Sequence, residues 1–147
     1  MKCRCSRRCK GADGIGDCMK RELTITTAAI DEAALVSKRV MSHGMGAAVY
    51  FAGVVRDSED GVAIRAIEYE AFEKMARHQF ELILQEIEKR WPVESVRLVH
   101  RIGVVRVNEA SLWVEIIAPH RGEALAACEF LIDEMKRTVP IWKKPVA

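Results

Sequence analysis

The sequence has few aromatic residues, little net charge and no long apolar run, and each shortage excludes a class of protein. Aromatic residues make up 6% of the chain, too few to predict the stacking surface with which many RNA-binding domains hold bases. The net charge of +2 does not favour nucleic acid as a partner. No apolar run approaches the roughly 20 residues of a membrane helix, and none follows the basic N-terminus as a secretory signal would. We therefore expect a cytoplasmic protein that binds neither nucleic acid nor membrane.

Recognisable metal and nucleotide motifs are also lacking. There is no phosphate-binding sequence G-x-x-x-x-G-K-[ST] and no His/Asp cluster, so we expect no metal and no cofactor. The first 20 residues do contain four cysteines: Cys3, Cys5, Cys9 and Cys18. Four thiolates suffice for a zinc site, but this spacing is not that of paired C-x-x-C sites. Because this segment also has no hydrophobic period, we predict a disordered tail over residues 1–20 and one domain over residues 21–147.

Apolar residues at three- and four-residue spacing predict three helices. The first begins after Thr27 or Asp31, either of which can cap a helix. The second covers about residues 72–91. The third ends near Thr138, because Pro140 disfavours helical geometry in the residue before it. The apolar side chains expected to face inward include Val40, Met75, Ile83, Ile87, Leu125, Cys128 and Leu131.

Segments with alternating or continuous apolar character predict the strands. They cover residues 23–26, 47–55, 63–70, 96–102 and 111–117. The uninterrupted apolar character of residues 47–55 predicts burial on both faces of that strand. Short connections favour antiparallel pairing, so the predicted order βαββαββα is that of an α+β fold and not of a doubly wound parallel sheet.

Basic side chains gather at both ends of the third predicted helix. His120 and Arg121 lie at its start, where free backbone N–H groups attract anions, and Lys136 and Lys143 lie near its end. Arg56 follows a predicted strand. Guanidinium and ammonium groups on a rigid framework are suited to a phosphate or carboxylate ligand. Each residue also has an ordinary explanation: His120 as a helix cap, Arg56 as the partner of a nearby aspartate, and the others as solvated surface charges.

Five motifs, in order along the chain, resemble the large, catalytic subunit of molybdopterin synthase. They are FAGVVR (51–56), EYEAF (68–72), VHRIG (99–103), APHR (118–121) and MKRTVPIWKK (135–144). The resemblance covers about residues 23–144. It implies an α/β-hammerhead-like fold with a mainly antiparallel sheet. It also implies a homodimer that binds two copies of a small ubiquitin-like sulfur-carrier subunit, which together form a heterotetramer.

The resemblance further implies a sulfurtransferase of molybdenum cofactor biosynthesis. Members of the family convert cyclic pyranopterin monophosphate into molybdopterin, and two sulfurs arrive as thiocarboxylates on the C-terminal glycine of the carrier. It makes Lys136 and Lys143 the catalytic residues. The substrate-binding residues that it implies are Val54, Val55, Arg56, His120, Arg121, Lys136, Lys143, Lys144 and Pro145. Because the family usually continues beyond the last residue here, the alternative is a catalytically weakened homologue that binds the carrier.

The length of the third predicted helix bears on how the basic residues can meet. His120 and Lys136 are 16 positions apart (136 − 120), which is about 24 Å along a continuous helix at about 1.5 Å per residue. These two residues cannot line one small pocket within one chain. We therefore predict a composite site, with Arg56, Lys136 and Lys143 from one protomer and His120 with Arg121 from the other.

Overall fold

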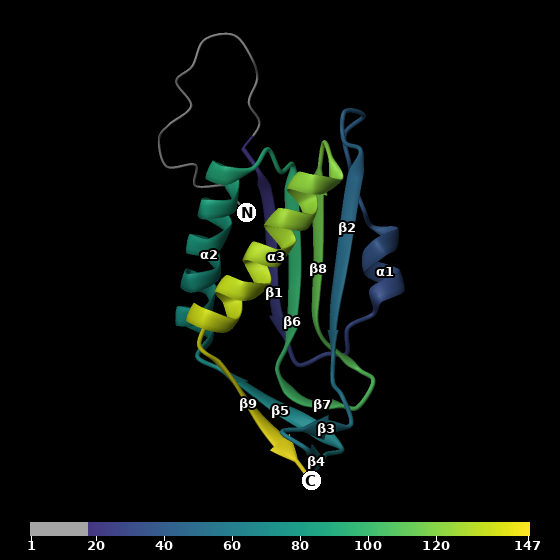
Figure 1. Ribbon diagram of the computed structural model, residues 1–147, viewed down its shortest axis with the longest axis vertical. Helices are drawn as coiled ribbons and strands as arrows, with labels where there is room; N and C mark the ends of the chain where they lie inside the picture. Colours follow the sequence, from purple (N-terminus) through teal and green to yellow (C-terminus); the bar gives the residue numbers. More distant parts are fainter. Residues whose placement is uncertain (1–17) are drawn as a thin grey trace.

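The computed structural model describes residues 18–147 (Figure 1). The elements in this range are, in chain order, β1 (Lys20–Thr26), α1 (Glu32–Ser37), β2 (Ala47–Val54), β3 (Ser58–Glu59), β4 (Val62–Ala63), β5 (Ala66–Ala71), α2 (Glu73–Arg90), β6 (Ser95–Arg101), β7 (Gly103–Arg106), β8 (Ala110–Ala118), α3 (Arg121–Thr138) and β9 (Ile141–Val146). The predicted α+β class and the order of the main elements are confirmed. The strands β3, β4, β7 and β9 are additions that the hydrophobic pattern did not predict.

Met19, which lies before the domain boundary predicted at residue 21, belongs to the main core. Met19 is buried, and its backbone N–H donates to Glu88 Oε1 at 2.9 Å. Residues 1–17 of the predicted tail, with Cys3, Cys5 and Cys9, lie outside the described residues. Within residues 18–147, no group of three or more His, Cys, Asp or Glu side chains is placed to hold a metal ion. No helix in this range has the length and apolar character needed to cross a membrane.

Two sheets organise the described chain. The larger has the strand order β1-β6-β8-β2, in which β1 runs parallel to β6 and the other pairs are antiparallel. The smaller has the order β7-β5-β9 and is antiparallel throughout, and β3 pairs with β4 in a short ribbon. Figure 1 shows α2 and α3 side by side across one face of the larger sheet, with the smaller sheet below its end. The predicted mainly antiparallel pairing is confirmed.

The central strand β8 is buried on both faces. Successive side chains of a strand point to opposite faces, and alternate residues such as Val114 and Ile116 pack with Phe80 of α2 and Leu131 of α3 in the main core. Every residue of β8 is buried. A strand in this position has neighbours on both edges and packed layers on both faces, so it holds the rest of the fold in place.

The prediction that residues 47–55 are buried on both faces is wrong. Strand β2 lies at the edge of the larger sheet, and its Phe51 and Val54 are 37% and 47% exposed. The inward orientation predicted for Val40, Met75 and Leu125 is also wrong, since all three are exposed. An apolar run shows which residues tolerate burial, but it does not show how many neighbours an element has.

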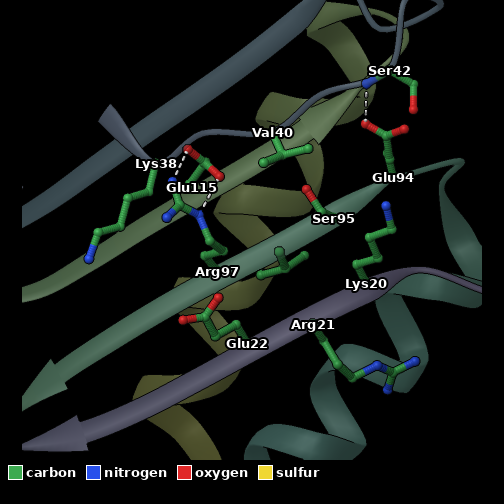
Figure 2. Close-up of a pocket in the computed structure, with 11 residues that line it drawn as sticks. Lys20, Arg21, Glu22, Lys38, Val40, Ser42, Glu94, Ser95, Arg97 and Glu115 are labelled. Atoms are coloured by element: carbon green, nitrogen blue, oxygen red, sulfur yellow. Dashed lines mark hydrogen bonds and ion pairs between the residues drawn. The ribbon is translucent and has the colours of Figure 1, made fainter. Parts of the chain in front are cut away.

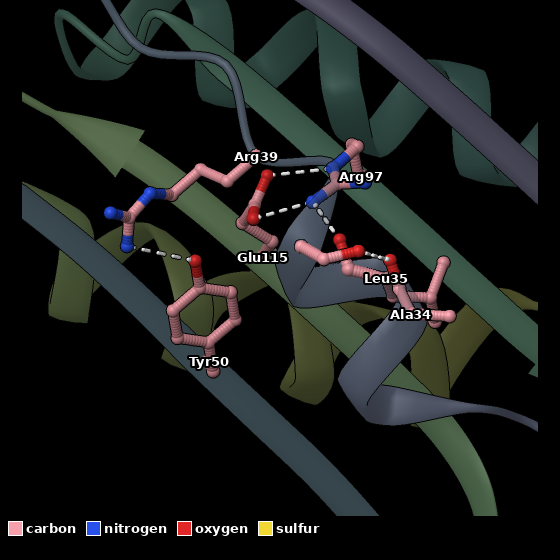
Figure 3. A network of polar contacts seen from close by, with 7 residues as sticks. Ala34, Leu35, Arg39, Tyr50, Arg97 and Glu115 are labelled. Atoms are coloured by element: carbon pink, nitrogen blue, oxygen red, sulfur yellow. Dashed lines mark hydrogen bonds and ion pairs between the residues drawn. The ribbon is translucent and has the colours of Figure 1, made fainter.

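A buried ion pair lies on the face of the larger sheet that α2 and α3 leave open (Figure 3). Arg97 on β6 donates to both carboxylate oxygens of Glu115 on β8, at 2.7 and 2.6 Å. It also donates to the carbonyl oxygen of Leu35 in α1 at 2.8 Å. Glu115 is fully buried. The hydrogen bonds that Arg97 donates to Glu115 raise the pKa of Arg97 above its ordinary value, although partial burial opposes this. The pair therefore fastens α1 to the sheet.

An aromatic contact joins the larger sheet to the smaller one. The ring of His100, on β6, meets the ring of Tyr69, on β5, edge to face with centroids 5.5 Å apart. His100 is 4% exposed, and its Nδ1 lies 2.9 Å from the carbonyl oxygen of Arg101. Burial lowers the pKa of His100, and the hydrogen bond to Arg101 only partly opposes this effect. The imidazole is therefore neutral at the junction of the two sheets.

We expect Glu115→Gln to lower the free energy of unfolding by about 3 kcal/mol, because it leaves the buried charge of Arg97 without its partner. Urea-induced unfolding measures the loss. The matched control is Glu86→Gln, which breaks the exposed Arg90–Glu86 pair on α2 and should cost about 0.5 kcal/mol or less. Equal losses in the two variants would contradict the role given to the buried pair.

We expect the stability of the fold to decrease as the pH falls below about 6.5, the ordinary pKa of histidine. In that range the unfolded chain binds a proton at His100 that the folded chain does not, so protonation favours unfolding. Free energies of unfolding measured from about pH 8 to pH 5 should show a slope that His100→Gln flattens. His78→Gln, on the exposed side of α2, should leave the slope unchanged, and a wild-type slope in the His100 variant would refute the assignment.

Candidate active site

The predicted residues Lys143, Lys144 and Pro145 lie on β9. In the antiparallel pairing of β9 with β5, Lys143 is opposite Tyr69 and Lys144 is opposite Glu68. Pro145 lacks a backbone N–H and is tolerated here because β9 is an edge strand. Alternation along the strand places Lys143 and Pro145 on one face and Lys144 on the other. The backbone of all three residues is therefore held by a sheet.

One carboxylate links two of the predicted cations. Glu59, the last residue of β3, accepts a hydrogen bond from the ammonium group of Lys143, and its Oε2 lies 3.9 Å from Nη2 of Arg56. The side chain of Glu59 is 12% exposed, whereas those of Lys143 and Arg56 are 52% and 79% exposed. The hydrogen bond from Lys143 lowers the pKa of Glu59 most, and the charges of Lys143 and Arg56 lower it further against an opposing effect of burial.

Glu59 was not among the residues predicted for the site, and an aspartate was expected as the partner of Arg56. The spacing of these residues in the sequence could not show the contact with Lys143, which lies 84 positions away. The contact depends on β9, and the apolar pattern did not predict that strand.

A tight hairpin sets the position of Glu59. Between β3 and β4 the chain turns at Asp60 and Gly61, whose φ angles are 50° and 79°. An Asp-Gly pair with positive φ at both positions is typical of the two-residue turns whose twist matches that of a hairpin. Val55 and Ile64, on either side of the hairpin, are buried in a small second core. The hairpin is therefore anchored at its base, and Glu59 projects from a fixed backbone.

The predicted residues Val54 and Val55 end β2 just before Arg56. Val54 is exposed, but the side chain of Val55 is buried. The backbone N–H of Val55 donates to the carbonyl oxygen of Glu109, and its carbonyl oxygen accepts from Asn108. Val55 therefore fixes the point from which Arg56 leaves the sheet, and its side chain is not available to a ligand in this chain.

The other predicted cations lie at opposite ends of α3. Lys136 is in the last turn, Arg121 is the first residue, and His120 is the N-cap residue, although its side chain makes no capping hydrogen bond. All three are exposed. Since α3 is continuous over 18 residues, His120 and Lys136 are on the order of 24 Å apart along its axis. Figure 1 shows the start of α3 at the end of the larger sheet that is far from β9.

A glycine in the loop before β2 contacts the residue that precedes the N-cap of α3. The backbone N–H of Gly46 donates to the carbonyl oxygen of Pro119 at 3.1 Å. A Cβ atom at Gly46 would lie 2.7 Å from that same oxygen, closer than atoms can approach without a shift. The absence of a side chain at this position therefore helps to place His120.

Two cavities lie away from these cations. One, of about 220 Å³, opens over β1 and β6 and is bordered by residues of both charge signs, among them Lys20, Lys38 and Glu94 (Figure 2). Glu94 already accepts a hydrogen bond from the backbone N–H of Ser42. The other, of about 420 Å³, lies between β2 and α3 and is mainly apolar. Neither is lined by Lys136 or Lys143, whose side chains are exposed to solvent.

Comparison with known proteins gives consistent matches. A family model described as "MoaE protein" matches residues 25–138. A protein of Aedes aegypti named molybdopterin synthase catalytic subunit 1 is 40% identical over 110 residues, which is 74% of this chain and 71% of that protein. The crystal structure of molybdopterin synthase from Staphylococcus aureus has a TM-score of 0.74 at 33% identity, over 85% of this chain and 89% of that one. These matches bear out the α/β-hammerhead-like fold that the resemblance implied.

A further solved structure contains two different subunits. It is a complex of subunits 1 and 2 of the molybdopterin-converting factor from Helicobacter pylori. One of its chains has a TM-score of 0.70 with this one at 25% identity, over 84% of this chain and 88% of that chain.

Proposed function

We propose a specific reaction for this chain, which belongs to the MoaE protein family and acts in molybdopterin synthesis. In this reaction the chain transfers two sulfur atoms to cyclic pyranopterin monophosphate and forms the dithiolene of molybdopterin. Each sulfur would arrive as a thiocarboxylate on the C-terminal glycine of a small ubiquitin-like carrier subunit. The Helicobacter pylori complex supports a second subunit as partner. The observation that carries the proposal is the cluster in which Lys143 and Arg56 flank Glu59. Lys143 lies on β9, the strand that follows the helix whose last turn carries Lys136.

Each cation would have a distinct part in this reaction. Lys136 would orient the thiocarboxylate and exchange protons as sulfur adds to the pterin side chain. Lys143 would hold the phosphate and stabilise the negative charge that develops when the cyclic phosphate opens. Arg56 presents a guanidinium fork, which suits the bidentate recognition of phosphate oxygens. Lys144 and Pro145 would complete the substrate-binding segment on β9.

We also propose that two copies of the chain share each site, as a homodimer within a heterotetramer. His120 and Arg121 would reach the phosphate from one protomer, and the lysines would come from the other. The uninterrupted length of α3 supports this arrangement, because it keeps the two groups apart in a single chain. The exposure of the cations also supports it, since a surface that a second chain completes is open when that chain is absent.

The alternative, a homologue that binds the carrier with little turnover, is not favoured. The relative from Aedes aegypti is named as a catalytic subunit, and the lysines that the proposal needs are present. A cytoplasmic location stays a prediction from the sequence.

We expect Lys136→Ala to lower turnover by about 10²-fold or more, the usual contribution of a group that transfers protons. The assay incubates the protein with the cyclic pterin and thiocarboxylated carrier and measures the dithiolene product. The matched control is Lys89→Ala, since Lys89 is likewise an exposed lysine in the last turn of a long helix. Near-normal turnover in the Lys136 variant would overturn its role. No product from the wild type would overturn the proposed reaction.

We expect a mixture of Lys136→Ala and Arg121→Ala subunits to regain activity that neither variant has alone. In a mixed dimer, one of the two sites receives Lys136 from one protomer and Arg121 from the other. Random pairing of equal amounts should give about one quarter of wild-type activity, because about half of the dimers are mixed and each has one intact site. The two variants carry different affinity tags so that mixed dimers can be isolated. Isolated mixed dimers without activity would argue against sharing.

A further inference from the structure

Glu59 is the member of the cation cluster to which the proposed reaction gives no part. We propose that Glu59 is a positioning residue, which holds the ammonium group of Lys143 and lies beside the guanidinium of Arg56, so that the free donors of both cations can face a bound anion. This inference rests on the proposed function, because it concerns the same site. Glu59 itself would not touch the substrate.

The difference in exposure between the three side chains indicates that Glu59 lies beneath the two cations. Glu59 is nearly covered, while Lys143 and Arg56 are largely open to solvent. An ammonium group has three donors, so the contact with Glu59 leaves two of them for a ligand. Arg56 lies at 3.9 Å from the carboxylate, too far for a hydrogen bond, and keeps all five donors. A ligand can therefore approach both cations from outside without displacing Glu59.

The carboxylate of Glu59 reduces the repulsion between the two cations. Two cations that converge on one phosphate repel each other when no ligand is bound, and a lysine side chain loses much rotamer freedom when it is fixed. With Glu59 ionised, as its lowered pKa indicates, the three groups carry a net charge of +1 (two cations and one anion). The carboxylate thus reduces the repulsion and selects one position of the Lys143 ammonium before substrate arrives.

The hairpin makes Glu59 a suitable support. A side chain on a flexible loop would move together with the lysine that it contacts. Here the two-residue turn and the buried residues at the base of the hairpin fix the backbone of Glu59. Lys143 is fixed in the same way by the pairing of β9 with β5. Because both backbones are fixed, the contact between the two side chains holds the ammonium group of Lys143 in one position.

The first test compares Glu59→Gln with Asp60→Asn. Each variant removes one negative charge from the same hairpin, and asparagine tolerates the positive φ of residue 60. We expect Glu59→Gln to lower kcat by about tenfold, since a misplaced Lys143 stabilises the transition state less well. The KM for the cyclic pterin should not rise, because the site becomes more positive. Asp60→Asn should change neither constant, and both variants should unfold at the wild-type temperature.

A different pattern of changes in kcat and KM would overturn the proposal. If Glu59 merely occupies the place of the substrate anion, Glu59→Gln should lower KM and leave kcat unchanged. If Glu59 only maintains the hairpin, the variant should unfold at a lower temperature, and its kcat should fall while its KM rises. A kcat that falls equally in the Asp60→Asn variant would show an effect of overall charge and would also count against a positioning contact.

A second measurement does not depend on activity. The rate at which acetic anhydride labels Lys143 can be followed by mass spectrometry, with the neighbouring Lys144 as internal reference. We expect Glu59→Gln to raise the labelling of Lys143 by about fivefold, because the ion pair covers one side of the nitrogen and holds it in place. The rate at Lys144 should not change. Unchanged labelling of Lys143 would refute the contact. Increased labelling in a protein that makes no product would uphold the contact and refute the proposed reaction instead.

Discussion

Antiparallel pairing between β5 and β9 is the contact on which the candidate site depends. It brings Lys143 from β9 to the hairpin of β3 and β4, so that it meets Arg56 and Glu59, which lie together in a distant segment of the chain. Backbone hydrogen bonds fix the register of this pairing, and the register decides which side chains share a face. Tyr69, opposite Lys143, is itself held by the buried ring of His100. The larger sheet therefore supports the position of a lysine that lies outside it.

The straightness of α3 is the second constraint, and it divides the site. Because α3 is continuous over 18 residues and packs against α2, β2 and β8, its two ends cannot come together. Its last turn leads into the smaller sheet, and its start lies at the far end of the larger one. Gly46 and Pro119 hold the far end, and β9 continues from the near end. An arrangement of this kind presents two separate groups of cations, each on a rigid base, as the proposed sharing of sites between two chains requires.

Much of the fold and part of the site followed from the sequence for physical reasons that differ between elements. The long helices were predictable because apolar spacing and the prolines at 92 and 140 mark them, and both end where those prolines require. The cations of the candidate site were recognisable through ordered motifs. Strand β9 was not predictable, because Trp142, Lys143, Lys144 and Pro145 have no apolar alternation and three of them are polar or lack a donor. Glu59 was missed for the same reason, since its partner lies on that strand.

The exposure of Lys143 and Arg56 has a consequence for how substrates are chosen. At physiological ionic strength the field of an exposed charge decays over about 8 Å, little more than the reach of the side chain that carries it. The cluster therefore does not attract anions from a distance, and dissolved salt competes with it for every weakly held one. Only a molecule whose negative groups match the spacing of the donors retains an advantage in a crowded, salty medium. Discrimination would then come from the shape of the charge distribution and not from the total charge.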